Sequence, residues 1–328
     1  MNRAPAYPRI SAVVIGRNEG ARLMACLNSL RGTVGDIVYV DSGSADDSVA
    51  RARDLGARVV ELDPATPFTA ARARNAGLAA LDRTRCDLVQ LIDGDCTLAP
   101  GWIDTAAAFL GDHPQVALVC GRREEENPGA SVYNRLCDLE WQGPAGATRA
   151  CGGDALARRA ALDAVGGFRA GLIAGEEPEL CLRLRRAGWT IWRLDALMTR
   201  HDARMTQFGQ WWRRSVRAGH AFAEGAHLHG APPERHWVAE TRRALIWGAG
   251  LPALIVLGAF VVHPAALVLA LAYPAQVLRL AARKGLTRRL AWEWAAFTVL
   301  GKFAEAQGVL RFHARRLLGR RARLIEYR

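Results

Sequence analysis

The sequence predicts an α/β protein in which helices cover both faces of a mostly parallel, Rossmann-like sheet, followed by a helical membrane-associated region. Three observations predict this architecture. Short β-branched runs alternate with amphipathic stretches through residues 10–194, acidic motifs directly follow several of these runs, and residues 244–278 contain no Asp, Glu, Lys or Arg. Alternating strands and helices are typical of parallel sheets, whose ligands bind at the carboxyl ends of the strands. We expect residues 1–202 to form the α/β domain, 203–243 an amphipathic linker, and 244–328 the membrane-associated region with a basic tail.

The composition excludes some classes of function. Of the 328 residues, 50% are hydrophobic and 23% are charged, so the chain can bury a core and is not mainly disordered. Its net charge is +12, but residues 279–328 alone carry thirteen basic and three acidic residues. The preceding part is therefore nearly neutral, which argues against a nucleic-acid-binding protein and favours an anionic partner at the C-terminal end. The seven cysteines are dispersed, with no CxxC pair, and predict reduced thiols without a disulfide framework or zinc site.

Each element of the α/β domain can be placed in chain order from its residue pattern. We expect strands at residues 10–15, 36–40, 57–62, 87–92, 116–120 and 190–194. We expect helices at residues 19–30, 45–55, 69–81, 101–111 and 155–165, where apolar residues recur at helical spacing. Ser44 and Thr69 are expected N-caps, because their hydroxyls can accept bonds from the first free backbone N–H groups. Pro178 is expected at the first position of a short helix that is closed by Gly188.

The uncharged run at residues 244–278 is 35 residues long, which is typical of a membrane segment. One span takes about 20 residues, so the run exceeds one span and falls short of two spans with a turn. His263 and Pro264 offer the turn, and basic residues flank the run at both ends, which predicts that both ends face the cytoplasm. A short hairpin or re-entrant pair of helices satisfies these observations best. A buried helical pair in a soluble domain remains the alternative.

Two other segments carry the aromatic and basic composition of a membrane interface. Residues 205–226 combine Trp211 and Trp212 with three arginines, which suits a helix at the level of the lipid headgroups, although an ordinary amphipathic packing helix remains the alternative. Residues 292–303 mix aromatic and charged side chains and fit either a third membrane helix or an interfacial one.

The acidic motif Asp93-Gly94-Asp95 directly follows the strand expected at residues 87–92. Two carboxylates around a glycine can hold a divalent cation that takes diphosphate oxygens as further ligands. Alone, such a motif is more often a solvated turn. Here it is the last of four segments in a fixed order, which read VVIGRNEG, VDSGSADDS, ARARNAGL and LIDGDC.

In this order the four segments resemble the family 2 glycosyltransferases, which are inverting enzymes of GT-A fold that use nucleotide sugars. The resemblance covers about residues 9–201 and is specific in its combination of motifs. It implies nucleotide-binding roles for Asn18, Glu19, Asp41, Arg74, Asn75 and Asp93. It also implies that Asp93 and Asp95 form a DxD pair that holds Mn²⁺ or Mg²⁺. A capped turn around Asp41 and a surface arginine at Arg74 remain the alternatives.

The segment GEEPEL, residues 175–180, supplies the candidate catalytic base. Family members carry GED, a variable residue and then EL at this place, and their Asp is the base. This chain has Glu177 there, one methylene longer, and a carboxylate can serve if it reaches the acceptor hydroxyl and stays ionised. The alternative is that the three glutamates of the segment only favour the positive end of a helix dipole.

The resemblance implies three further assignments. Gly152, Gly153, Asp154 and Glu176 are placed on the acceptor side, where a plain helix-start turn is the alternative. His201 matches a place where many GT-A enzymes supply an additional metal ligand, although a lone histidine is usually structural. Processive members carry a tryptophan after the base motif that is absent at the matching place in QWWRR, residues 210–214, so a single-addition enzyme is expected.

Together the resemblance and the residues predict an inverting glycosyltransferase at the cytoplasmic face of the cytoplasmic membrane. It is expected to move one sugar from a nucleotide diphosphate sugar, with a UDP-sugar favoured, to a hydroxyl acceptor for which the membrane region suggests lipid linkage. Membrane lipids are expected partners and nucleic acid is not. Two alternatives stay open: a non-catalytic membrane assembly subunit, which the Glu177 departure supports, and a nucleotidyltransferase, for which IGRNEG is a poor triphosphate loop.

Overall fold

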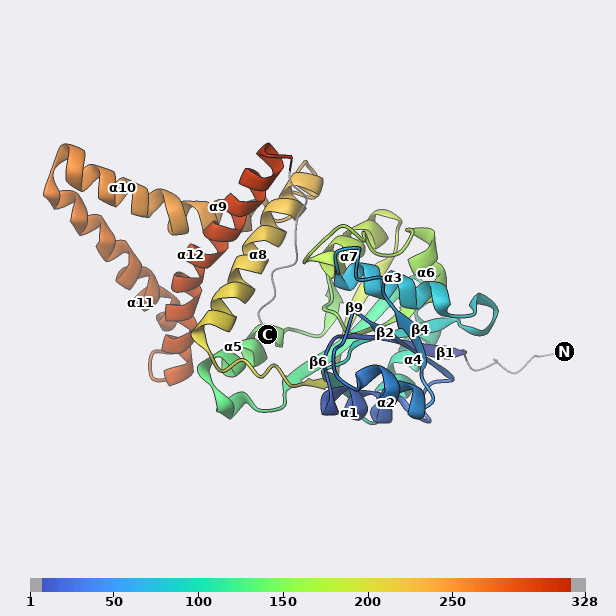
Figure 1. The fold of residues 1–328 in the computed structure, drawn as a ribbon. Coiled ribbons are helices and arrows are strands. Elements are labelled where there is room, and N and C mark those ends of the chain that lie inside the picture. Colours follow the sequence, from blue (N-terminus) through green and yellow to red (C-terminus); the bar gives the residue numbers. More distant parts are fainter. Residues whose placement is uncertain (1–7, 320–328) are drawn as a thin grey trace. The chain divides into compact units, whose positions relative to one another are not determined.

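The structure, a computed structural model, describes residues 8–319 and divides into two compact units. The sheet unit contains the chain up to Gly129 together with Cys137–Leu172 and Glu176–Arg204. The helical unit contains Ala130–Leu136, Ile173–Gly175 and the chain from Met205 onward. Figure 1 labels the helices and strands of both units.

A mixed sheet organises the sheet unit, and its strands follow the order β3-β2-β1-β4-β8-β6-β9-β5, with β7 paired to β9. The strands are β1 Ile10–Gly16, β2 Asp36–Asp41, β3 Arg58–Glu61, β4 Leu88–Asp93, β5 Cys96–Leu98, β6 Val116–Glu125, β7 Gly146–Thr148, β8 Ala155–Arg158 and β9 Thr190–His201. The pairings among β1, β2, β3 and β4 are parallel, as the alternating pattern predicts. Strand β8 then enters antiparallel between β4 and β6. The α/β fold class is therefore confirmed. The other half of the sheet is mixed, because β6 and β9 pair in parallel while β8, β5 and β7 pair antiparallel, and the sequence did not predict these antiparallel strands.

Helices surround this sheet (Figure 1). They are α1 Ala21–Leu30, α2 Ser48–Asp54, α3 Ala70–Ala80, α4 Trp102–Asp112, α6 Arg159–Ala164 and α7 Glu176–Arg186, while α5 Val132–Trp141 crosses the boundary between the units. The prediction for Thr69 is confirmed, because its side chain accepts from the backbone N–H of Arg72 at the start of α3. The prediction for Ser44 is wrong: α2 begins only at Ser48, and the Ser44 hydroxyl bonds Asp41 instead.

Two further boundaries correct the sequence prediction. The helix expected at 155–165 begins as strand β8, because Ala155, Leu156 and Ala157 are fully buried between two neighbouring strands, and this pairing overrides the helix propensity of alanine. Helix α7 begins at Glu176, so Pro178 occupies its third position and not its first. A proline is tolerated there because the N–H groups of a first helical turn have no partner within the helix.

The helical unit consists of α8 Phe208–His229, α9 Val238–Leu245, α10 Leu251–Leu257, α11 Ala272–Lys284 and α12 Arg289–Leu317, and shorter helical segments at Ile246–Gly250, Gly258–Val262 and Pro264–Leu271 lie between α9 and α11. Two stretches of it, Val238–Val262 and Pro264–Lys284, are long and apolar enough to cross a membrane by length and composition. The turn between them lies at His263, as predicted. Helix α12, which contains the aromatic segment 292–303, is not among the candidate spans of the described residues.

Helix α12 approaches its neighbours backbone to backbone, through glycines. A Cβ added at Gly308 of α12 would lie 2.1 Å from the Val216 carbonyl oxygen, and one at Gly219 of α8 would lie 2.0 Å from the Glu305 carbonyl oxygen. On another side of α12, a Cβ at Gly248 would lie 1.9 Å from the Lys302 carbonyl oxygen. Side chains at these positions would force the helices apart, so glycine is required for the observed packing.

Replacing Gly308 by Ala is therefore expected to destabilise the helical unit by about 1–3 kcal/mol, because the new methyl group overlaps a backbone carbonyl that cannot rotate away. Thermal unfolding of the purified full chain measures the effect as a lower Tm. Gly209→Ala is the matched control, since Gly209 lies in α8 and the nearest atom to an added Cβ is 3.5 Å away, at the end of the Arg213 side chain. An equal loss of Tm in both variants would contradict the packing role of Gly308.

Candidate functional site

Three carboxylates of the sheet unit gather around one buried arginine. Arg74, on α3, donates from Nη2 to Asp93 Oδ1 over 2.8 Å, at the carboxyl end of β4. Its Nη1 lies 2.9 Å from Glu176 Oε1 and 2.9 Å from Glu177 Oε1, at the start of α7. The Arg74 side chain is 2% exposed. One guanidinium therefore brings the first aspartate of the DGD motif and the candidate base into a single cluster, although they are far apart in sequence.

The two glutamates of this cluster differ in their access to solvent. The Glu176 side chain is 3% exposed and that of Glu177 is 18% exposed. Burial and the neighbouring Glu176 carboxylate raise the pKa of Glu177 to about 7, against the opposing effect of the Arg74 charge. Of the pair, Glu177 is the one whose carboxylate can meet a ligand, and a group with this pKa can gain or lose a proton near neutral pH.

Asp154 lies beneath the cluster and not at its surface. It is fully buried, and its Oδ1 accepts from the backbone N–H of Asp93 over 3.0 Å. Its Oδ2 accepts from the Thr199 hydroxyl over 2.8 Å and lies 2.5 Å from Arg123 Nη2. The resemblance implies an acceptor-side role for Asp154. In the structure both of its carboxylate oxygens contact protein groups, and the bond from the Asp93 N–H holds the end of β4 in place.

The loop before Asp154 needs glycine at one position. A Cβ at Gly153 would lie 2.6 Å from Arg74 Nη2 and 2.7 Å from Asp93 Oδ2, whereas a Cβ at Gly152 would meet nothing within 4 Å. Gly153 therefore lets the backbone lie directly against the Arg74–Asp93 pair. Of the two glycines, Gly152 is the one with space beside it for another molecule.

A second cluster lies at the turn after β4. Asp95 Oδ2 is 3.1 Å from His201 Nε2, and one ligand atom from each of Asp95, Cys96 and His201 lies within 4.8 Å of the others. The antiparallel pairing of β5 with β9 explains the proximity, because it sets Cys96 opposite His201. Burial lowers the pKa of His201, but the nearby Asp95 and Glu125 carboxylates outweigh it, and the net shift is upward. The carboxylates of Asp95 and Glu125 therefore place negative charge around the imidazole, which also favours a bound cation.

The Asp95 carboxylate and the His201 imidazole could together hold a divalent cation. Carboxylate oxygen suits both Mg²⁺ and Mn²⁺, whereas imidazole nitrogen is a ligand of transition metals and not of Mg²⁺. The Nδ1 of His201 lies 3.5 Å from Glu125 Oε2, and such a partner orients the other ring nitrogen toward a metal. Asp95 and His201 are therefore the residues that could hold the ion, and Asp93, bound to Arg74, is available beside them.

The residues predicted beneath the nucleotide mainly tie two loops together. Asn18 donates its backbone N–H to Ser44 Oγ over 2.8 Å and accepts from the Ala45 N–H over 2.7 Å. Asp41 is buried, and both of its carboxylate oxygens accept bonds from its own turn, at Gly43 and Ser44. The capped turn left open by the sequence is therefore present at Asp41.

Two more predicted residues are engaged within the protein. Glu19 is buried and pairs with Arg22 over 2.6 Å. The Asn75 side chain accepts from the Phe168 N–H over 2.8 Å and donates to the Phe168 carbonyl over 2.7 Å. Asn75 thereby fastens the loop 166–168 to α3, next to the Arg74 cluster.

Sequence reasoning missed two residues of the site, Arg123 and Trp141, both from segments left without an assignment. Arg123 bridges Asp154 to the ring of Trp141, with its guanidinium carbon 5.4 Å from the ring centroid. Trp141 also meets His201 edge to face, with ring centroids 4.7 Å apart. The available signal was the charged run 122–126, which directly follows the strand expected at 116–120; the strand in fact continues to Glu125 with register shifts.

Comparison with known proteins identifies the family. Residues 11–164 match the family model described as "Glycosyl transferase family 2". This segment is a family 2 glycosyltransferase domain. A curated relative, the "Pre-mycofactocin glycosyltransferase" of Mycobacterium tuberculosis, is 31% identical over 241 residues, which are 69% of this chain and 49% of that protein. The chain therefore spans about half the length of this relative.

Solved structures show the fold of this chain. The mannosyltransferase PcManGT from Pyrobaculum calidifontis, in complex with GDP-Man and Mn²⁺, is similar with a TM-score of 0.64 and 18% identity, over 93% of this chain and 88% of that one. S. aureus TarS 1-349 is similar with a TM-score of 0.52 and 15% identity, over 92% of this chain and 91% of that one. The expected GT-A fold is thereby confirmed.

Proposed function

We propose that this protein transfers one sugar from a nucleotide diphosphate sugar to a hydroxyl acceptor with inversion of configuration. The observation that carries the proposal is the single buried guanidinium of Arg74, which joins Asp93 of the DGD motif to Glu177. A cation-binding acid and a base with a pKa near neutrality therefore lie within one cluster, as a one-step displacement requires. A UDP-sugar is the donor that we favour, and GDP-mannose is the second candidate because the mannosyltransferase of the same fold was solved with it.

In this mechanism Glu177 accepts the proton of the acceptor hydroxyl while that oxygen forms a bond to the anomeric carbon. The bond from that carbon to the diphosphate breaks on the opposite face, so the configuration inverts in one step and the nucleoside diphosphate leaves. Asp95 and His201, with Asp93, would hold Mn²⁺ or Mg²⁺, which supplies charge stabilisation to the departing diphosphate. Arg74 keeps the Glu177 carboxylate in place beside them.

We further propose that the reaction takes place at the cytoplasmic face of a membrane and that its acceptor is lipid-linked. Two apolar helices of the helical unit are long enough to cross a bilayer, and basic residues flank their uncharged core. This combination favours a membrane surface with anionic lipids as partner. A membrane-held enzyme meets a lipid-linked hydroxyl at high local concentration, which supports such an acceptor.

The reaction class is tested by incubating the full chain in detergent with UDP- and GDP-sugars, with and without Mn²⁺, and identifying the released product. A nucleoside diphosphate is expected, and Mn²⁺ is expected to increase its release. Release of pyrophosphate would instead indicate a nucleotidyltransferase. If no sugar nucleotide raised the Tm of the protein or was consumed in the presence of Mn²⁺, a non-catalytic assembly subunit would be the better description.

Replacing Asp95 by Asn tests the proposed metal site. The amide keeps the size of the side chain but removes its charge, so the affinity for Mn²⁺ is expected to fall by about 10-fold or more, with a larger loss of activity. Titration of Mn²⁺ followed by electron paramagnetic resonance measures the affinity without an activity assay. Asp195→Asn is the matched control, because Asp195 lies exposed on β9 and pairs with Arg122 at the surface. Equal Mn²⁺ affinity in the two variants would place the ion elsewhere.

A further inference from the structure

Both candidate spans of the helical unit have one end packed along α12. In the first span, Ala244 shares a small apolar core with Val309 and Phe312. One turn later, Gly248 contacts α12 so closely that an added Cβ would lie 1.9 Å from the Lys302 carbonyl oxygen. The first half of the span Val238–Val262, up to about Gly248, therefore runs along α12.

The second span returns to α12 in the same way. The ring of Tyr273 lies 5.4 Å from that of Phe303, and the Tyr273 hydroxyl donates to the Trp247 carbonyl over 2.8 Å. Farther along α11, the Lys284 ammonium lies 5.2 Å over the ring of Trp294. Helix α11 thus runs antiparallel along α12 from about Phe303 to Trp294. Between the packed ends of the two spans, most side chains of residues 251–271 are exposed in the described part of the chain.

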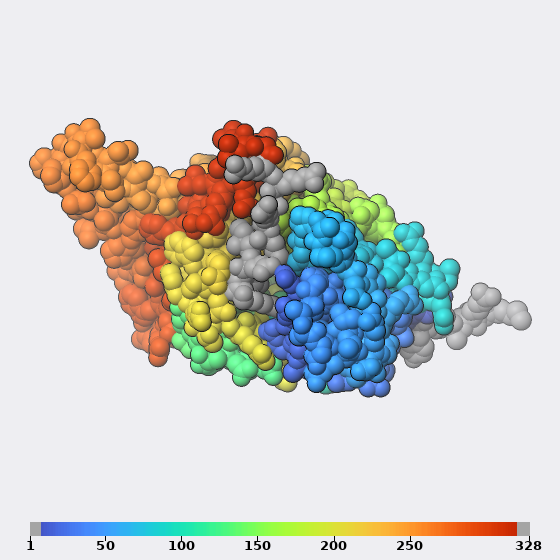
Figure 2. Space-filling view, in the orientation of Figure 1, coloured from blue at the N-terminus to red at the C-terminus, as the bar shows by residue number. Residues whose placement is uncertain are grey.

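Residues 251–271 form a V-shaped hairpin in Figure 1, and in the face drawn in Figure 2 no other segment of the helical unit covers its orange arm. Its tip is apolar and bare: Phe260 is 87% exposed, Val261 77% and Val262 83%. The twelve residues 251–262 give an arm of roughly 18 Å at 1.5 Å per residue. The hydrocarbon core of a bilayer is about 30 Å thick, so this arm reaches little beyond its middle.

The turn at the tip satisfies its own backbone donors. The N–H of His263 donates to the Gly258 carbonyl over 2.9 Å, and the N–H of Ala266 donates to the His263 carbonyl over 3.0 Å. Pro264 has no N–H, and the N–H of Ala265 donates to His263 Nδ1 over 3.1 Å. In hydrocarbon every backbone donor must find its partner within the protein, and this turn meets that condition without water.

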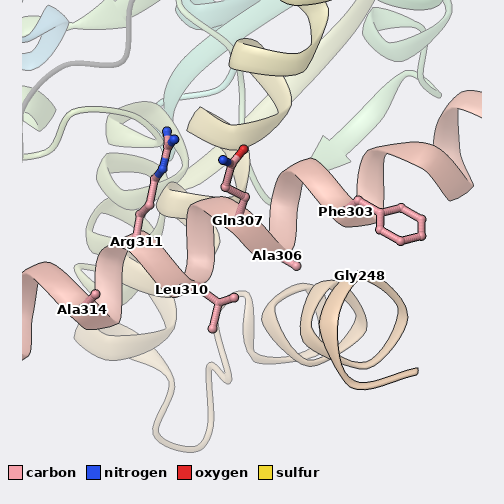
Figure 3. A pocket seen from close by; sticks show the side chains of 7 residues that line it. All are labelled: Gly248, Phe303, Ala306, Gln307, Leu310, Arg311 and Ala314. Atoms are coloured by element: carbon pink, nitrogen blue, oxygen red, sulfur yellow. The ribbon is translucent and has the colours of Figure 1, made fainter. Parts of the chain in front are cut away.

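Helix α12 carries charged residues along its length and is not among the candidate spans of the described residues. Two of these residues form ion pairs, with Glu293 3.0 Å from Arg135 and Lys302 2.5 Å from Glu305. A groove of about 400 Å³ on α12 is lined by Gly248, Leu310 and Arg311, among others. In Figure 3 the Leu310 side chain points toward Gly248, whereas Arg311 points to the other side of α12. Apolar lining residues together with an arginine suit the level where acyl chains meet headgroups.

We propose that residues 251–271 form a re-entrant hairpin that enters and leaves one leaflet through the same membrane face, with α12 lying along that face. The partner is the hydrocarbon of a single leaflet, with anionic lipids at the basic residues that flank the hairpin. The proposal rests on the membrane attachment proposed above and is independent of the chemistry of the sheet unit.

The experiment uses the full chain in vesicles of phosphatidylcholine and phosphatidylglycerol, with cysteine introduced singly at Arg243, Val262 or Arg283. A membrane-impermeant maleimide added outside is expected to label the Arg243→Cys and Arg283→Cys proteins in equal proportion. The Val262→Cys protein is expected to stay unlabelled by reagent outside or trapped inside, until detergent is added. Labelling of Val262→Cys by the trapped reagent, or of the two flanking positions from opposite sides, would overturn the proposal in favour of complete spans. The unaltered chain sets the background, since six of its seven cysteines are buried.

A second measurement separates insertion from mere adsorption. Val262→Glu is expected to lower vesicle binding at least 10-fold, whereas Leu317→Glu, at an equally bare position near the end of α12, is expected to change it little. Equal losses would contradict insertion of the tip. If the unaltered chain does not bind vesicles, this proposal and the membrane attachment fall together, while the assay of glycosyl transfer in detergent still decides the proposed chemistry separately.

Discussion

Replacing Glu177 by Gln is expected to lower kcat for glycosyl transfer by about 10²–10⁴-fold, the range that general base catalysis contributes. Glutamine keeps the length of the side chain and can still accept a bond from Arg74, but it cannot take the proton of the acceptor hydroxyl. The affinity for the donor sugar nucleotide and for Mn²⁺ should change only a few fold. Steady-state release of the nucleoside diphosphate measures kcat, and calorimetry measures the two affinities.

The pH dependence of kcat/KM tests the assignment of Glu177 as the base independently. The pKa of Glu177 is raised to about 7 by burial and by the neighbouring Glu176 carboxylate, and the base is active only when deprotonated. The value of kcat/KM, which reports on the free enzyme, should therefore rise with pH through about 7 and then level off. The Glu177→Gln protein should lack this rise. A pH-independent rate between about pH 5.5 and 8.5 in the unaltered protein would contradict the assignment.

Glu176→Gln is the matched control, because Glu176 contacts the same Arg74 nitrogen from a buried position. Its rate loss should be much smaller than that of Glu177→Gln. Since the Glu176 carboxylate raises the pKa of Glu177, its removal should move the rise of kcat/KM to lower pH. If Glu176→Gln instead abolished the activity and Glu177→Gln did not, the roles of the two residues would have to be exchanged.

The parallel half of the sheet could be predicted from sequence because its signals are local. Strands β1, β2 and β4 are compact β-branched runs, and each ends in the motif that the sequence analysis singled out. Parallel strands bring their carboxyl ends to one edge, so Asp93 and the loop of Asn18 were expected at the same side of the sheet. The proximity of Asp93 and Glu177 was also anticipated, through the resemblance to known glycosyltransferases.

The other half of the sheet unit could not be predicted because its signals are not local. Nothing within residues 155–158 distinguishes an alanine-rich strand from a helix; the pairing of β8 with β4 and β6 decides it. The same holds for Asp154, whose position beneath Asp93 depends on β8, and for Arg123, which continues β6 through register shifts. The roles of the predicted site residues in binding and catalysis remain predictions that the variants above test.

Removing the charge of Arg74 is expected to affect both stability and chemistry. In the Arg74→Met protein three carboxylates lose their common cation, and breaking a buried ion pair costs about 3–5 kcal/mol. Arg74 also lowers the pKa of Glu177, so its loss should raise that pKa and move the rise of kcat/KM to higher pH. Circular dichroism and thermal unfolding establish whether the variant is folded. Arg74→Lys provides a second variant that keeps the charge in case Arg74→Met does not fold.

The kinetic signature separates a positioning role from a merely structural one. If Arg74 acts by holding Glu177, the loss of kcat in Arg74→Met should largely disappear in the background of Glu177→Gln, because effects within one catalytic unit are not additive. Arg169→Met is the control, since Arg169 pairs over 3.2 Å with Glu179, which lies on α7 like Glu177. It should leave the pH profile unchanged. Two results together would contradict this role: additive losses of kcat in the double variant, and an unshifted pH profile of kcat/KM in Arg74→Met. They would show that Arg74 only stabilises the fold and that its contacts with Asp93 and Glu177 do not contribute to catalysis.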